Sequence, residues 1–415
     1  MSGGGDSLAL LLVAADRARD RGTALIPVTI DHGLRPESAS EAEIIAERAR
    51  RLGLDPVIIR WEGAKPERGL QAAARDFRLR SFARLAREHG AATILLGHTL
   101  DDQAETVWRR LLAGGGFDAL SGMSHSDPLP LWPQGRGLRL VRPLLGVRRA
   151  ALRDWLEARD ERWIDDPSNE NPAYSRVADR QVLARLERHG FDPARLALLA
   201  GEMRTVKTGE AETAARWLME NAVFHAWGCV SFGDVETAPL AALDAARAAV
   251  SGDPAPDRKA ARQILDAVRA RTPMTVAGVA VRFKKGGPVL IRDPGCETGR
   301  ADNSQAGPAL VRLGMESLWD GRFEITGADI EVHTLQRRTP PGFAMKDVAG
   351  VTPLSRPGLP GVWKGDEFQG FVGLEPRCEA ARWLAHELMA RNLFGDRAPQ
   401  WFHTQLRDQT AQGSH

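Results

Sequence analysis

Two stretches of the chain carry residue types that chemistry on a nucleotide would need. The first is a glycine-rich turn with two hydroxyls and a carboxylate: Ser2, Gly3, Gly4, Gly5, Asp6 and Ser7. Glycines let backbone N–H groups approach an anion closely, and the helix expected over 7–20 adds unpaired donors and a partial positive charge. The turn therefore predicts a phosphate cradle. A plain flexible turn is the alternative, because the motif is neither a Walker A loop nor G-x-G-x-x-G.

The second stretch, residues 97–106, brings carboxylates to the start of a helix. It contains Gly97, His98, Asp101, Asp102, Glu105 and Thr106. Residues three and four apart share one helix face. Beside a triphosphate, Asp101 and Asp102 could hold Mg²⁺ or bind and deprotonate an attacking amine. A capping box, in which Asp102 reaches back to Thr99, is the alternative.

Asp6 is acidic inside the predicted phosphate turn, which is unusual unless a cation is shared with the phosphate. We therefore expect Asp6 and Asp102 as candidate Mg²⁺ ligands; simple charge complementarity at a helix N-terminus is the alternative for Asp6. The hydroxyls of Ser2 and Ser7 could donate to phosphate oxygens, or Ser7 could cap the helix.

The elements around these stretches alternate between strand and helix. Apolar runs at 24–30, 56–59 and 92–96 predict buried strands. Helical spacing is found at 7–20, 37–52, 71–88 and 102–112. The alternation predicts an α/β fold with a parallel doubly wound sheet.

Carboxyl ends of parallel strands face the ligand crevice in such sheets. This places four residues beside the expected nucleotide: His32, Arg35, Gly97 and His98. We expect the two histidines to line the site as hydrogen-bonding groups. Arg35 is expected to pair with a phosphate, or to be a solvated loop arginine.

A phosphate turn normally follows a buried strand, whereas only Met1 precedes Ser2 here. We expect either that the start codon is assigned too late or that the sheet lacks its central strand.

The later chain changes character. Residues 113–137 are rich in Gly and Pro and are expected to form a loop, followed by a strand at 138–144 and a helix at 147–158. Spacing is mostly helical over 182–269, with a break near 228–233, and short strands are expected over 275–371 before a helix at 380–394. The predicted domains are an α/β domain at 1–190, a helical linking domain at 191–275 and a small mixed β-rich domain at 276–415.

Composition limits the class of protein. The net charge of +2 is too small to indicate nucleic-acid binding by itself. The cysteines, Cys229, Cys296 and Cys378, are far apart without C-x-x-C, which disfavours a disulfide framework or a zinc site and fits a reducing cytoplasm. No apolar run is long enough to span a bilayer, so we expect a cytoplasmic protein.

Three motifs together resemble those of the tRNA(Ile)-lysidine synthetase family, which belongs to the PP-loop, or N-type ATP pyrophosphatase, enzymes. They are Ser-Gly-Gly-x-Asp-Ser at 2–7, Asp-His-Gly-Leu-Arg-Pro-Glu-Ser at 31–38 and Gly-His-x-x-Asp-Asp-Gln-x-Glu-Thr at 97–106. Their order and their spacings, near 25 and 60 residues, match, and the resemblance is strong over residues 2–190. It implies an adenine nucleotide alpha hydrolase-like fold that uses ATP and Mg²⁺, with residues 1–190 as the catalytic domain. It also implies tRNA binding by the helical domain at 191–275, and tRNA as a further partner for Arg35.

The resemblance also implies a reaction. ATP would adenylate the C2 carbonyl oxygen of the wobble cytidine in the CAU anticodon of tRNA(Ile), and pyrophosphate would leave. The amine of free lysine would then displace AMP, so that the product lysidine reads AUA instead of AUG. The partners are thus this tRNA and lysine, with no membrane and no obligate protein partner, in a monomer or homodimer. Alternatives are another PP-loop tRNA-modifying enzyme of the thiolase type or a tRNA-binding homologue without catalysis.

Several charged residues are candidates for substrate or tRNA contact. They are Arg75 in an A-R-x-x-R segment, Glu105, and Arg142 and Arg148 in and after an R-P-L-L element, whose neighbours include Arg149. Arginines near a nucleotide site suit RNA backbone contact. The sequence departs from the family pattern at two places: Ala113 stands where the family has an arginine, and Val177-Ala178-Asp179-Arg180 keeps one arginine only.

Overall fold

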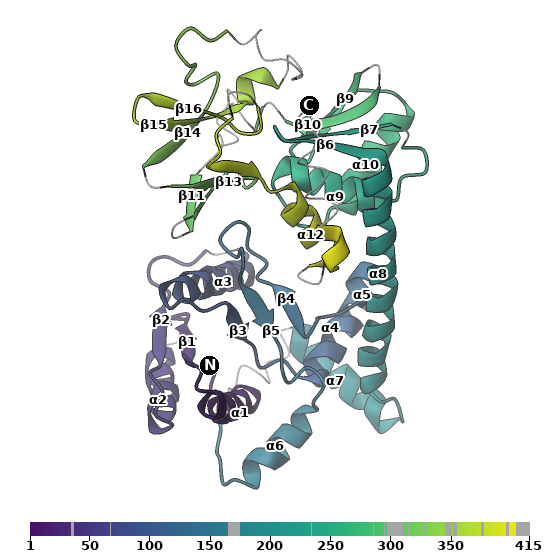
Figure 1. The fold of residues 1–415 in the computed structure, drawn as a ribbon. Coiled ribbons are helices and arrows are strands. Elements are labelled where there is room, and N and C mark those ends of the chain that lie inside the picture. The colour runs from purple at the N-terminus through teal and green to yellow at the C-terminus, as the bar shows by residue number, and fades with distance from the viewer. Residues whose placement is uncertain are drawn as a thin grey trace. The chain divides into compact units, whose positions relative to one another are not determined.

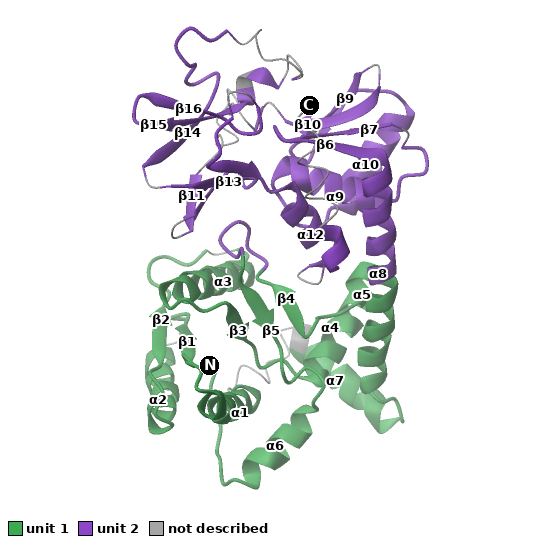
Figure 2. Cartoon of the chain, viewed as in Figure 1, with its two compact units in different colours: residues 1–129, 137–207 green, residues 130–136, 208–415 purple. Residues whose placement is uncertain are grey.

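The computed structural model describes residues 1–34, 37–66, 68–164, 175–233, 235–284, 286–293, 295–296, 310–313, 316–327, 329–344, 351, 355–374, 377–395 and 398–403. The chain forms two compact units (Figure 2). Unit 1 comprises residues 1–129 and 137–207, and unit 2 comprises residues 130–136 and 208–415.

The strands of unit 1 pair in two sheets among the described residues. β1 (Val28–Asp31) pairs in parallel with β2 (Val57–Arg60). β3 (Thr93–Leu95) pairs in parallel with β5 (Arg139–Val141), and β4 (Ser126–Pro128) joins β5 antiparallel. The α/β class and the parallel pairing are confirmed, but the expectation of a single parallel sheet is corrected to two sheets with one antiparallel edge strand. The Gly/Pro-rich composition of 113–137 concealed β4, whose proline sits at a sheet edge.

Seven helices of unit 1 lie within its described ranges (Figure 1): α1 (Gly5–Arg21), α2 (Ser38–Arg51), α3 (Leu70–Glu88), α4 (Leu100–Leu112), α5 (Phe117–Leu120), α6 (Arg149–Glu157) and α7 (Ser175–Arg188). One apolar core joins α1 to α6. Leu152 and Leu156 of α6 are buried against Leu8 and Leu11 of α1. This packing fixes the N-terminal end of α6 relative to the glycine-rich turn that begins α1.

α8 (Ala194–Asn221) runs from unit 1 into unit 2, whose first sheet follows it. The sheet is antiparallel with the order β6 (Ala222–His225), β7 (Cys229–Phe232), β10 (Gly287–Arg292), β9 (Val279–Lys284) and β8 (Met274–Val276). α9 (Leu240–Ser251) and α10 (Arg258–Arg269) pack with it. The break expected near 228–233 is the turn and second strand of the β6–β7 hairpin, where Gly228 has φ +97° and a Cβ would lie 2.9 Å from Phe323.

The remaining strands of unit 2 confirm the expected β-rich C-terminal region. One sheet contains β11 (Leu310–Leu313), β12 (Glu316–Trp319), β13 (Phe323–Thr326) and β17 (Ala381–Trp383). Another contains β14 (Ile330–Thr334), β15 (Pro360–Lys364) and β16 (Glu367–Phe371), with a 3₁₀ turn at Arg356–Gly358 before β15. The terminal helix is α12 (Ala385–Phe394). Its expected start at residue 380 is wrong, because residues 381–383 pair with β13.

Residues 130–136 belong to unit 2 although β4 and β5 flank them in sequence. The indole of Trp132 donates to the carbonyl of Gly321 at 2.8 Å. Arg136, with 12% of its side chain exposed, ion-pairs with Glu387, Glu316 and Glu324 at 2.9, 2.7 and 3.4 Å. A short, mostly half-buried segment is thus held in unit 2 by one guanidinium and one indole.

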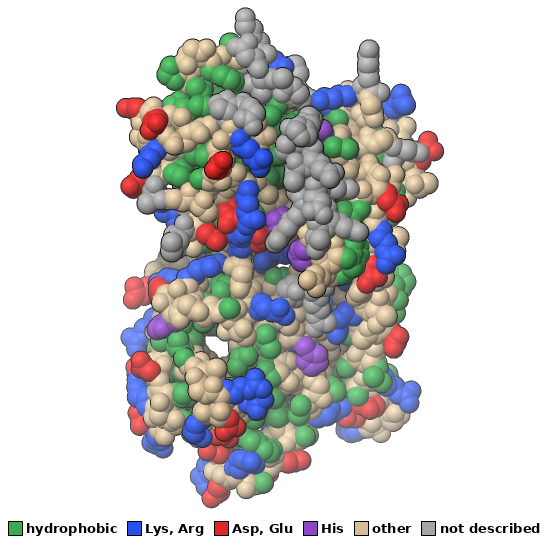
Figure 3. Space-filling view, in the orientation of Figure 1, with side chains coloured by type: hydrophobic (Ala, Val, Ile, Leu, Met, Phe, Trp, Pro, Cys, Tyr) green, Lys and Arg blue, Asp and Glu red, His purple; other side chains and the backbone are tan. Residues whose placement is uncertain are grey.

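Charges of both signs are interspersed over the face shown in Figure 3, in a chain whose net charge is +2. Among the helices of the described ranges, none is both long and apolar enough to cross a membrane.

Candidate active site

The two sequence motifs meet on a residue that belongs to neither. The guanidinium of Arg149, the first residue of α6, donates from Nε to Asp6 at 2.9 Å and from Nη2 to Asp102 at 2.8 Å. Its Nη1 lies 3.5 Å from Glu105, one turn further along α4. The expectation that the glycine-rich turn and the Asp-Asp helix lie together is therefore confirmed.

Burial and charge act together in this cluster. Burial raises the pKa of the Asp6 carboxyl, the charge of Asp102 adds to that rise, and the hydrogen bond from Arg149 opposes it. Burial alone would lower the pKa of Arg149, but Asp102, Asp6 and Glu105 outweigh it and raise that pKa above its usual value. Arg149 therefore stays cationic and supplies the positive charge that Asp6 and Asp102 require.

Asp101 positions this guanidinium through the backbone. Its Oδ2 accepts a hydrogen bond from the backbone N–H of Arg149 at 2.7 Å, and Arg148 lies 3.4 Å from its Oδ1. The first N–H groups of a helix have no partner within the helix, and a carboxylate there is also favoured by the helix dipole. Asp101 thus caps α6 from α4 and fixes the residue that carries the central cation.

Asp102 has two roles in the structure. It forms the capping box with Thr99, whose backbone N–H donates to Asp102 Oδ2 at 2.7 Å and whose Oγ1 accepts from the Asp102 N–H at 3.4 Å. The capping alternative is thus confirmed, but the other oxygen of the same carboxylate faces Arg149. The cap orients the side chain without using the oxygen that points into the cluster.

The glycine-rich turn is held at both ends. The backbone N–H of Ser2 donates to Ser7 Oγ at 3.1 Å, and the carbonyl of Gly3, whose φ is +80°, accepts from the N–H of Ile164 at 3.0 Å. The N-cap of α1 is Gly4, which has no side chain to offer its first N–H groups. Its first N–H groups therefore receive no side-chain cap, at a helix N-terminus of the kind that binds anions.

Gly97 is needed because the two motifs approach closely. A Cβ on Gly97 would lie 3.2 Å from the backbone carbonyl oxygen of Asp6. His98 follows it in the turn before α4, next to the N-cap Thr99. The glycine thus allows the strand-end turn to pass directly over the first turn of α1.

The histidine motif lies at the end of β1. Burial and the charge of Arg78 lower the pKa of His32, whose ring packs edge-on against Trp61 and Phe77. Asp31 accepts from the Gly33 N–H at 2.9 Å, which shapes the turn after the strand. These contacts fit His32 as a lining group. Arg35 lies outside the described residues.

The arginine candidates differ in their surroundings. Arg75 is exposed on α3. Arg148 is partly exposed and ion-pairs with Asp101, Glu187 and Asp192. Arg142 is 6% exposed and donates to Asp127 and to the carbonyl of Ser124, so its guanidinium supports the turn before β4.

Glu105 and the departures from the family pattern are connected. Glu105, 5% exposed, accepts from Arg180 of α7 at 3.0 Å as well as facing Arg149. Asp179, a departure from the pattern, pairs with Arg109 of α4 at 2.8 Å. The pair therefore joins α7 to α4 and places Arg180 against Glu105. Ala113, the other departure, is the C-cap of α4.

Within the described ranges, no three His, Cys, Asp or Glu side chains gather as a metal-binding group. Mg²⁺ is often bound by one or two carboxylates together with substrate phosphates. Asp6 and Asp102 fit that kind of donor set, in which phosphate supplies the other oxygens.

The sequence prediction missed Arg149 as a site residue. It was grouped with arginines expected to meet RNA, whereas it faces carboxylates from α1 and α4. One signal was available: Asp6, Asp102 and Glu105 placed together need a fixed cation, and Arg149 lies in the first turn of the helix predicted at 147–158.

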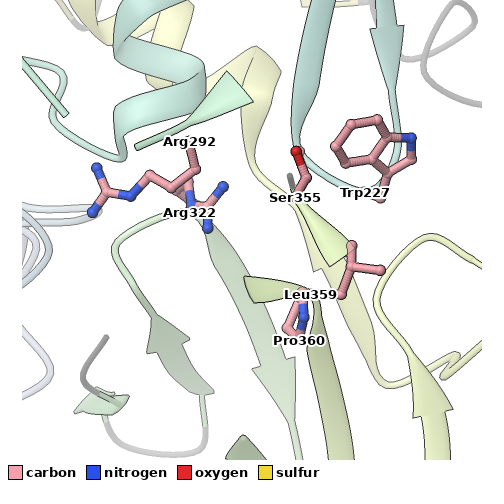
Figure 4. Close-up of a pocket in the computed structure, with 7 residues that line it drawn as sticks. Trp227, Arg292, Arg322, Ser355, Leu359 and Pro360 are labelled. Atoms are coloured by element: carbon pink, nitrogen blue, oxygen red, sulfur yellow. The ribbon is translucent and has the colours of Figure 1, made fainter. Parts of the chain in front are cut away.

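A separate small cavity lies within unit 2 (Figure 4), lined by Trp227, Gly228, Arg292, Arg322, Ser355, Leu359 and Pro360. Arg292 and Arg322 both ion-pair with Asp320, at 2.8 and 2.7 Å. Its charged lining is therefore engaged in an internal ion-pair cluster, and none of the motif residues contributes to it.

Comparison with known proteins agrees with this geometry. A family model described as a PP-loop domain matches residues 1–186. The chain is 41% identical over 222 residues to the tRNA(Ile)-lysidine synthase of Hyphomonas neptunium, which covers 53% of this chain and 59% of that protein. A solved U34-tRNA thiolase from Methanococcus maripaludis matches with 15% identity and a TM-score of 0.41, over 50% of this chain and 70% of that chain, which is too distant to carry an argument.

The chain thus spans about three fifths of the length of the Hyphomonas protein. A longer match exists to the tRNA(Ile)-lysidine synthase of Caulobacter vibrioides, with 32% identity over 366 residues, 86% of this chain and 82% of that protein. The PP-loop domain that this match includes contains the turn and the helix that converge on Arg149. This chain belongs to the tRNA(Ile)-lysidine synthase family.

Proposed function

We propose that this chain ligates lysine to the wobble cytidine of a tRNA(Ile) with a CAU anticodon, using ATP. The observation that carries the proposal is the convergence of the glycine-rich turn and the Asp-Asp helix on Arg149 in a chain of this family. ATP would adenylate the C2 carbonyl oxygen, which is a poor leaving group until it carries AMP. The amine of lysine would then displace AMP.

The turn over residues 2–7 is the proposed binding site for the ATP phosphates. The backbone N–H groups at the start of α1, where the N-cap makes no side-chain hydrogen bond, would provide donors and a favourable dipole. Gly97, His98, His32 and Arg35 are proposed to complete the nucleotide site. Mg²⁺ would be held by Asp6, with Asp102 as a second candidate ligand, and would offset the charge of the triphosphate.

Asp102 is the proposed group that binds the amine and takes its proton. An amine attacks only when it is neutral, and a carboxylate within hydrogen-bond reach can accept the proton. Its capping box fixes the side chain while Oδ1 faces the cluster. Asp101 is proposed to act by holding α6 in place, and Glu105 to complete the negative surface that receives lysine.

Contact with tRNA is proposed for the exposed Arg75 and the partly exposed Arg148. Arg142 is assigned to the support of its turn instead, because it is buried and paired. A thiolase is a weaker candidate, since the cysteines, Cys229, Cys296 and Cys378, are each buried and all belong to unit 2.

The direct test is pyrophosphate release by the purified protein with ATP and a tRNA(Ile) transcript, with and without lysine. The proposal predicts release that depends on the tRNA and AMP formation that depends on lysine. Release no greater than with ATP alone would overturn it, as would turnover that requires a sulfur donor in place of lysine.

A further inference from the structure

Every nitrogen atom of the Arg149 guanidinium faces a different carboxylate. Nε faces Asp6 at 2.9 Å, Nη2 faces Asp102 at 2.8 Å and Nη1 faces Glu105 at 3.5 Å. Only 17% of the Arg149 side chain is exposed, and 7% of that of Glu105. A planar guanidinium matches such an arrangement because its donors are fixed in one fork.

The same carboxylates are those that the proposed reaction needs for the lysine amine. An ammonium group and a guanidinium are both cations that take carboxylate oxygens as partners. Asp102 Oδ2 is already engaged by Thr99, which leaves Oδ1 for the cluster, and this oxygen accepts from Arg149. Arg149 and the substrate amine therefore compete for one position.

ATP would change this competition. Its phosphates, bound at the turn that contains Asp6, would offer Arg149 charge-assisted and bidentate acceptors. They would also add negative charge beside a cluster in which Asp6 and Asp102 already repel each other. A second cation is then favoured in the place that the guanidinium leaves.

The backbone of Arg149 would not need to move. Its N–H is held by Asp101 at 2.7 Å, and α6 is packed on α1 through Leu152 and Leu156. The inference therefore requires only a rotation of the side chain about this fixed point, since the guanidinium already lies 2.9 Å from Asp6, in the first turn of the helix that follows the proposed phosphate turn.

We propose that Arg149 occupies the position of the lysine amine when nucleotide is absent and moves to the phosphates when ATP binds. Lysine then binds after ATP. This inference rests on the proposed function and adds to it an order of binding enforced by one residue.

The test measures binding of radiolabelled L-lysine by equilibrium dialysis, with and without α,β-methylene ATP and Mg²⁺. For the wild-type protein we expect the analogue to tighten lysine binding by at least about tenfold. For Arg149→Gln we expect the analogue to tighten lysine binding several-fold less than in the wild type, because the competing cation is gone and only the charge of the phosphates remains.

Arg180→Gln is the matched control, since it removes one positive charge from Glu105 alone. It should keep the dependence on nucleotide. Wild-type lysine binding that is independent of the analogue would overturn the inference, and so would an undiminished effect of the analogue in Arg149→Gln or lysine binding that stays undetectable with the analogue. An inactive wild-type enzyme in the pyrophosphate assay would instead overturn the proposed function.

Discussion

Asp6 and Asp102 share one guanidinium, although one carboxylate belongs to the first turn of α1 and the other to the first turn of α4. The arrangement joins the predicted phosphate turn to the predicted amine-binding helix. It also means that both carboxylates depend on the same positive charge, that of Arg149, so a change at one carboxylate is expected to affect the other.

The first prediction concerns the charge of Asp102. Asp102→Asn keeps an oxygen that can accept from Thr99, so the capping box and the fold should survive, while the charge that faces Arg149 is lost. We expect turnover to fall below detection and thermal stability to change by less than about 1 kcal/mol. Lysine-dependent AMP formation and thermal unfolding measure the two effects.

Thr99→Ala is the control for that variant. It removes the cap and should cost about 1 kcal/mol of stability, while it keeps the Asp102 charge and measurable turnover. Wild-type rates in Asp102→Asn would refute the catalytic role of this carboxylate.

A second prediction concerns the close approach of the two motifs. Gly97→Ala would place a Cβ 3.2 Å from the Asp6 carbonyl oxygen, so the glycine-rich turn must shift by a few tenths of an ångström. We expect the KM for ATP to rise several-fold. Gly146→Ala is the comparison, because a Cβ there meets no atom within 4 Å. Equal ATP affinities in the two variants would contradict the proposed position of the nucleotide.

A third prediction tests the route of tRNA binding. Arg75→Glu reverses an exposed charge on α3, which should weaken tRNA binding and reduce its dependence on salt. Arg80→Glu is the control, because Arg80 lies on the same helix but is paired with Asp76 at 2.7 Å. Filter binding over a series of salt concentrations gives the tRNA affinity and its dependence on salt. If the logarithm of the binding constant falls with the logarithm of the salt concentration equally steeply for wild type and Arg75→Glu, Arg75 is not part of the interface.

A fourth prediction concerns the stability of unit 2. Arg136→Ala removes one of two arginines that pair with the buried Glu324 and leaves Arg382. We therefore expect the free energy of unfolding to fall by about 3 kcal/mol. Arg258→Ala, which breaks a half-exposed pair with Glu210, should cost less than about 1 kcal/mol. Urea unfolding followed by Trp fluorescence measures both.

The effect of Arg136→Ala should also depend on pH. Burial alone would raise the pKa of Glu324, but Arg382 and Arg136 outweigh it and lower that pKa. A carboxyl group whose pKa is lower in the folded state stabilises the fold at pH values above its pKa in the unfolded state. That stabilisation is lost as the pH falls through its pKa in the folded state. The difference in the free energy of unfolding between wild type and Arg136→Ala should therefore be largest at neutral pH. It should shrink as the pH falls below the usual pKa range of glutamate. A difference that stays constant would exclude Glu324 as its source.

The sequence was informative where a local pattern determines the structure. The spacing of Asp102, Glu105 and Thr99 predicted both a helix face and its cap, because both depend on residues within one turn. The order of strands and helices in residues 24–112 was equally local. The β6–β7 hairpin was not foreseen, since its strands are four residues each and lie between long helical segments.

Contacts between distant segments could not be derived in the same way. Arg149 meets Asp6 only because Leu152 and Leu156 pack α6 on α1, and no spacing in the sequence records that packing. The burial of Arg142 depends likewise on the turn at Ser124 and Asp127. Residues 130–136 belong to unit 2 through Trp132 and Arg136, whose partners lie at least 180 positions away.

The central claim is that this chain attaches lysine to a wobble cytidine. Mass spectrometry of nucleosides from a tRNA(Ile) transcript with a CAU anticodon, treated with the protein, ATP and lysine, tests it most directly. We predict a cytidine heavier by one lysine less one water, which is absent when Asp102→Asn replaces the wild type. An unmodified cytidine, or one that carries sulfur instead, would contradict the account.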